Sequence, residues 1–128
     1  MQVNPKEFIE TEYPLLTSKY TKVFEEAEYT YNAPHRFKVI NSETLEDIQN
    51  IHFQEGPIKE CGVNGVMNED LIAMVIRRLE GFQNSEFNCR DNAIAITKLE
   101  EALLWLRKRT MAREARGVEG THTVKDGR

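Results

Sequence analysis

The sequence has little cysteine and histidine, and it has no long hydrophobic run. Its two cysteines, Cys61 and Cys89, stand in unlike contexts without CxxC or Cys/His spacing, so we expect neither a structural zinc site nor a disulfide. We expect both to be packing residues. Three scattered histidines, with no GxSxG or HExxH motif, give no catalytic constellation. We therefore expect no enzymatic activity, no bound metal and no cofactor.

Signals for a membrane or for export are also missing. No apolar stretch approaches the roughly 20 residues that span a bilayer. The first residues, MQVNPKEFIETEYP, lack the positive segment and the apolar segment that make up a secretory signal. We therefore expect a cytoplasmic protein with no membrane partner.

The sequence lacks an overall positive charge, because 21 Asp and Glu outnumber 17 Lys and Arg for a formal net charge of -4. The distribution is uneven: from Glu101 onward seven Lys or Arg stand against four acids, a net +3 that leaves -7 for the first hundred residues. A long nucleic acid needs a broad positive surface, so we expect none as a partner. An acidic body with a basic end suits a local anionic ligand better.

The N-terminal region, residues 1–57, indicates a small antiparallel sheet. Residues 37–40 are β-prone, 41–43 are turn-prone, and a second apolar stretch around Ile51 ends before Gly56. For residues 19–28 the periodicity allows either a short helix or a strand. The glycines in 62–66 indicate a linker to the rest of the chain.

The C-terminal region, residues 58–128, indicates an antiparallel helical hairpin followed by a short tail. Asn68, before two acids, predicts the N-cap of a helix over about 69–84. Asn88 predicts the start of a second helix over about 89–116. The fold class is therefore α+β, within one structural unit.

Apolar side chains repeat at three–four spacing in both predicted helices. The repeat comprises Ile72, Val75, Leu79 and Phe82 in the first helix, and Ile96, Leu99, Leu103, Leu106 and Thr110 in the second. Leu104 and Trp105 widen the apolar surface of the second helix beyond one stripe. Because one hairpin cannot bury both faces, we predict an oligomer.

Three arginines near the end of the second helix are the most specific indication of a binding site. Arg109, Arg113 and Arg116 follow i, i+4, i+7 spacing, which places them on one helical face. Guanidinium groups match phosphates by bidentate hydrogen bonding, so the face is a candidate anion site. The alternative is a solvated helix end whose cations favour the helix dipole.

Two further segments offer chemistry that suits a nucleotide. In the interhelical loop, Phe82 could stack on a base and the asparagines Asn84 and Asn88 could read its edge; alternatively Phe82 is only the last residue of the apolar repeat. Asn92, one turn into the second helix, is unusual there because asparagine is a poor helix former; alternatively it is only a polar residue of the first turn. The segment GVEGTH comprises Gly117, Val118, Glu119, Gly120, Thr121 and His122. Its backbone N–H groups could approach an anion, although a helix C-cap explains its first glycine equally well.

The runs FKVIN, IHFQEGPIKE, GVNGVMNEDLIAMVIRRLEGFQ and CRDNAIAITKLEEALLWLRKRTMAREARGVEGTH resemble the phage anti-Thoeris nucleotide sponges. The hairpin part also resembles the anti-CBASS sponges, which lack the N-terminal sheet. The resemblance implies a protein that binds, without cleaving, the glycocyclic ADP-ribose signal made by TIR-domain defence enzymes in an infected bacterium.

The same resemblance implies the site and the assembly. The main pocket would use Phe82 for stacking, Asn92 for a polar contact, and Arg109 and Arg113 for the pyrophosphate. Homodimers would form through the hairpin and build a hexamer as a trimer of dimers, with pockets between protomers. A separate site for cyclic di- or trinucleotides would draw on Arg116 and the segment 117–122. The alternative function is an oligomeric hairpin module that binds acidic protein or nucleic acid.

Overall fold

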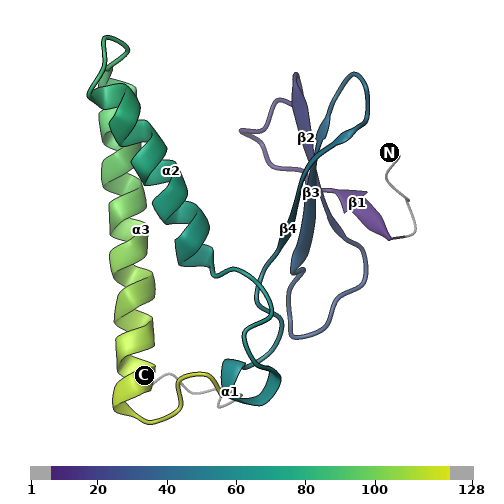
Figure 1. Ribbon diagram of the computed structural model, residues 1–128, viewed down its shortest axis with the longest axis vertical. Coiled ribbons are helices and arrows are strands. Elements are labelled where there is room, and N and C mark those ends of the chain that lie inside the picture. Colours follow the sequence, from purple (N-terminus) through teal and green to yellow (C-terminus); the bar gives the residue numbers. More distant parts are fainter. Residues whose placement is uncertain (1–6, 122–128) are drawn as a thin grey trace. The chain divides into compact units, whose positions relative to one another are not determined.

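The computed structural model describes residues 7–121, which divide into two compact units (Figure 1). The sheet unit comprises the residues up to 56 together with 63–66, and the hairpin unit comprises 57–62 and the residues from 67 onward. The sheet is antiparallel, and the helices follow it along the chain. The predicted α+β class is confirmed.

The sheet has four strands that pair antiparallel in the order β1-β2-β3-β4. They are β1 (Phe8–Glu10), β2 (Thr21–Glu26), β3 (Arg36–Asn41) and β4 (Asp47–His52). The predicted hairpin of 37–40 with the following apolar stretch is the β3–β4 pair. Between the two alternatives for 19–28, the structure has the strand. That strand is flanked on both sides by partners, one of them the short β1 that the sequence did not indicate.

One face of the sheet buries Ile40, which is 2% exposed, beside the charged residue Lys38, which is 9% exposed. The Lys38 ammonium group lies 3.0 Å from Oδ2 of Asp47 and 5.2 Å from the centroid of the Phe8 ring. The hydrogen bond from Lys38 holds the pKa of Asp47 below its ordinary value, because the lysine stabilises the charged carboxylate. The carboxylate of Asp47 thus compensates the charge of Lys38, which is buried beside apolar side chains.

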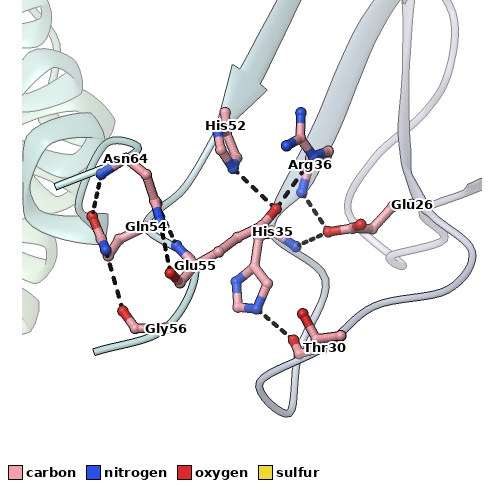
Figure 2. A network of polar contacts seen from close by, with 9 residues as sticks. All are labelled: Glu26, Thr30, His35, Arg36, His52, Gln54, Glu55, Gly56 and Asn64. Atoms are coloured by element: carbon pink, nitrogen blue, oxygen red, sulfur yellow. Dashed lines mark hydrogen bonds and ion pairs between the residues drawn. The ribbon is translucent and has the colours of Figure 1, made fainter. Parts of the chain in front are cut away.

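Residues 63–66, most of the predicted linker 62–66, lie against the end of β4 and belong to the sheet unit. Val66 forms a parallel bridge with Phe53, and the side-chain amide of Asn64 pairs with the backbone N–H and C=O of Glu55 at 2.8 Å each. Figure 2 shows this pairing beside a second cluster. There Glu55 accepts from His52 at 3.0 Å and from Arg36 at 3.2 Å.

The helices are α1 (Ile58–Cys61), α2 (Asn68–Gln83) and α3 (Arg90–Ala115), and α2 and α3 form the predicted hairpin (Figure 1). Both predicted N-caps are wrong by one residue. At α2 the cap is Met67, whose backbone N–H donates to the Asp70 carboxylate at 2.8 Å. At α3 the cap is Cys89, whose sulfur accepts from the backbone N–H of Asn92 at 3.4 Å. The Asp70 carboxylate and the Cys89 sulfur therefore accept the N-terminal hydrogen bonds that asparagine side chains were expected to accept.

The packed stripe of α3 follows the predicted repeat, whereas that of α2 is shifted. Ile72 and Leu79 lie on the α2 stripe as expected, but its most buried residue is Ile76, at 8% exposed. Val75 and Phe82 lie off the stripe, with exposures of 47% and 39%. The three–four spacing fits both sets, so only the packing against α3 distinguishes them.

The apolar cores of the two units are small. Among residues 7–121, Ile40 and Ile76 are the apolar side chains classed as buried, while Leu104, Trp105 and Met111 on α3 are 70%, 66% and 54% exposed. Both cysteines are exposed, so they are not the packing residues we expected, and no disulfide joins them. None of the helices in the described range combines the length and apolarity that a membrane span requires.

Candidate functional site

The hairpin places the four main candidate residues at its two opposite ends. Phe82 is the penultimate residue of α2 and Asn92 is the third residue of α3, so both lie at the loop end. Arg109 and Arg113 lie near the C-terminal end of α3. Asn92 and Arg109 are 17 positions apart, which corresponds to about 26 Å along the helix. One chain therefore brings together each pair but not both pairs.

The loop end is fixed by a side chain that the sequence reasoning missed. The Gln83 amide donates to the backbone C=O of Cys89 at 3.0 Å and accepts from the Cys89 N–H at 2.9 Å. Ser85 adds a hydroxyl bond of 2.6 Å to the C=O of Phe82 and accepts from the N–H of Phe87 at 3.1 Å. The sequence signal that could have indicated Gln83 is its position four residues after Leu79, which places it on the packed stripe of α2.

Phe82 and Asn92 have side chains available at this fixed end. The Phe82 ring is 39% exposed and off the packed stripe, which argues against the alternative that it is only a core residue. Its neighbour in the loop, Phe87, is 67% exposed. Asn92 uses its backbone N–H in the cap, and its side-chain amide forms no hydrogen bond with residues 7–121. An exposed aromatic face and an amide suit recognition of a base.

The arginine end differs from the expectation of three guanidinium groups projecting together. Arg109 and Arg116 are exposed, but Arg113 is only 7% exposed. Its Nη2 donates to the backbone carbonyls of Val118 at 3.0 Å and Thr121 at 3.1 Å. The cause is the tail, which turns back after α3 and offers these carbonyls to the guanidinium. Exposure of Arg113 was therefore a wrong expectation, while its role toward a ligand stays a prediction.

The turn of residues 117–121 explains how the tail returns. Gly117 and Gly120 have φ of +73° and +75°, values that favour glycine. The N–H of Gly117 donates to the backbone C=O of Glu114, and the N–H of Val118 donates to the backbone C=O of Arg113, each at 3.0 Å. These two bonds complete the C-cap of α3. The C=O of Gly120 accepts from the N–H of Lys59 in α1 at 3.0 Å.

These contacts bear on the second candidate site. The backbone N–H groups of Gly117, Val118 and Thr121, as well as the Thr121 hydroxyl, are all engaged within the turn. They do not point outward as a nest for an anion, contrary to our expectation. Glu119 is half-buried in the same turn, and His122 lies outside the described residues. Use of this segment by a second ligand stays a prediction.

Electrostatics at the loop end add one more group. The guanidinium carbon of Arg78 lies 5.2 Å from the centroid of the Phe82 ring, a cation–π arrangement. In the part of the chain that the structure describes, no three His, Cys, Asp or Glu side chains gather in a group that could hold a metal ion. The candidate chemistry is therefore aromatic stacking and amide hydrogen bonding at one end, with guanidinium groups at the other.

Comparison with known proteins identifies the family. A family model described as the Acb2/Tad1 hairpin domain matches residues 46–111. The protein called Thoeris anti-defense 1, from Bacillus phage SBSphiJ7, is 52% identical over 138 aligned residues, which cover 88% of this chain and 97% of that protein. The resemblance drawn from the sequence is confirmed, and the chain belongs to the Acb2/Tad1 hairpin-domain family.

Proposed function

We propose that this chain acts against Thoeris defence as a non-catalytic sponge, which sequesters the glycocyclic ADP-ribose signal. The observation that carries the proposal is the 52% identity to Thoeris anti-defense 1 over nearly the full length of that protein. Three kinds of group suit a base and a pyrophosphate: the exposed Phe82 ring, the Asn92 amide, which forms no hydrogen bond within residues 7–121, and the arginines of α3. Sequestration starves the defence effector of its signal.

The pocket in this proposal is shared between two copies of the chain. About 26 Å of helix separates Asn92 from Arg109, more than one compact nucleotide can span. An antiparallel pair of hairpins would set the loop end of one copy against the arginine end of the other. Exposed Leu104, Trp105 and Met111 provide an apolar surface for such pairing, since the core of one hairpin is small. A trimer of such dimers is the assembly we propose for the cell.

The proposal is tested by capture and release. Purified protein is mixed with glycocyclic ADP-ribose, the bound fraction is separated and heat-denatured, and the released material is analysed by mass. The expected result is depletion of free ligand followed by release of the intact molecule. Absence of depletion would refute sequestration, and recovery of cleaved ligand would show an enzyme instead. A parallel titration with cyclic di- and trinucleotides tests the second site at Arg116 and residues 117–122.

A further inference from the structure

Arg78 is a charged residue at the loop end that neither the sequence motifs nor the family resemblance assigned to the pocket. It lies on α2, four residues before Phe82, so both side chains project from the same helical face. Its guanidinium carbon is 5.2 Å from the ring centroid, and it has no carboxylate partner among residues 7–121. The ring is therefore its defined contact in the hairpin.

This contact leaves the two faces of the Phe82 ring unlike each other. The guanidinium of Arg78 lies over one face of the ring, which leaves the opposite face as the open one for a base. A ring that is 39% exposed near a helix end has several rotamers available, and a guanidinium that rests on it favours one of them. Restricting the Phe82 ring to one rotamer before the ligand binds lowers the entropic cost of binding.

We propose that Arg78 is a positioning residue of the nucleotide pocket, which holds the Phe82 ring so that the adenine of the ligand stacks on its other face. This inference rests on the proposed function, because it assigns a role within the same pocket. Arg78 acts through the ring and does not bind the ligand phosphates itself.

The neighbouring Arg77 provides a matched control. It carries the same charge one position earlier on α2, and both arginines are exposed. Its side chain runs toward Gly81, where its Nη1 lies 3.9 Å from the place a Cβ would occupy. Arg77→Ala and Arg78→Ala therefore remove the same charge, but only the second removes the contact with the ring.

The experiment titrates glycocyclic ADP-ribose into the wild-type protein and both variants by calorimetry. Arg78→Ala is expected to weaken the affinity about twofold to fivefold, the range of one exposed cation–π contact, whereas Arg77→Ala should keep the wild-type affinity. Thermal melts of both variants should match the wild type, since the residues are exposed. Equal effects of the two variants, or no effect of Arg78→Ala, would overturn the proposal.

Two measurements separate positioning from direct contact with phosphate. In a Phe82→Leu background, Arg78→Ala should cause no further loss, because the ring through which it acts is gone. In the wild-type background, the affinity ratio between wild type and Arg78→Ala should not change between low and high salt. A ratio that shrinks with salt would indicate a direct phosphate contact and refute the positioning role. Failure of the wild-type protein to bind would instead refute the proposed function.

Discussion

The guanidinium of Arg113 donates a hydrogen bond of 3.1 Å to the backbone carbonyl of Thr121, eight residues further along the chain. Together with the bond to Val118, it fixes the turn whose Gly120 carbonyl receives the N–H of Lys59. Arg113 is thus a structural residue of the hairpin unit, whatever it does for a ligand. Its two proposed roles need separate measurements.

Replacing Arg113 by alanine should lower the free energy of unfolding by about 1–3 kcal/mol, because two carbonyls lose a charged donor in a partly buried turn. Urea denaturation measures the loss, and hydrogen exchange should show faster exchange at the amides of Val118 and Thr121. Arg77→Ala is the control, since it removes an equal charge from an exposed position of α2 and should cost less than about 0.5 kcal/mol. Equal stability of the two variants would contradict the structural role.

Patterns of apolar residues predicted the long elements of the fold, but neither the short elements nor the burial of a charged residue. The hairpin and the β3–β4 pair follow from their periodicity. β1 has three residues and α1 has four, too few for any period to appear. Lys38 shares a face with the buried Ile40, although a lysine is ordinarily expected in solvent, and its ammonium group lies over the ring of Phe8 in β1. Part of the environment of this lysine is therefore a strand that left no signal in the sequence.

The candidate site was predictable in its residue types and less so in their environments. Spacing and composition singled out the arginines of α3 and Phe82 as candidates. The burial of Arg113 depends on where the tail folds, and its i, i+4, i+7 spacing contains no information about that. Phe82 was predicted to end the apolar repeat of α2, because the predicted repeat and the packed stripe, which differ by one position, both satisfy three–four spacing. Gln83 was missed since its importance comes from backbone partners six residues away.

Gly65 and Gly81 should respond to alanine in opposite directions. A Cβ at Gly65 would lie 2.5 Å from backbone atoms of His52 and Phe53, where no flexible side chain can move away. We expect Gly65→Ala to destabilise the sheet unit by about 1–3 kcal/mol. Gly81 is exposed in α2 with its nearest neighbour at 3.9 Å, so Gly81→Ala should stabilise the helix by about 0.5–1 kcal/mol. Thermal melts of the two variants check both signs, and a neutral Gly65→Ala would contradict the close approach.

The ion pair of Lys38 and Asp47 should make stability depend on acid. The pKa of Asp47 is lower in the folded chain than its ordinary value, so the unfolded chain binds the proton more readily. The stabilisation is present above the ordinary pKa and is lost as the pH falls through the folded value. Asp47→Asn should therefore flatten the decline in stability between about pH 5 and pH 2. Urea denaturation across this range measures it, with Glu43→Gln in the adjoining turn as the control that keeps the wild-type decline.

A pocket shared between two copies predicts complementation between defective chains. One variant chain carries Phe82→Ala and Asn92→Ala, which remove the candidate side chains of the loop end. The other carries Arg109→Ala, which removes an arginine of the opposite end. Each variant alone should lose binding of glycocyclic ADP-ribose, because every pocket then lacks one half. Co-expression with two different affinity tags, tandem purification and selection of the dimer-sized fraction, apart from any larger assembly, isolate the mixed dimer for titration.

In the mixed dimer, one pocket receives both intact ends and the other receives both defective ends. The binding capacity should therefore return to about half of the wild-type value, with affinity close to normal, because a two-fold dimer contains two equivalent pockets. Doubly tagged dimers of Arg109→Ala alone provide the control and should stay inactive. If the mixed dimer also stays inactive, the two ends do not meet across chains. Since α3 holds them about 26 Å apart within one chain, the four residues could then not form one site at all.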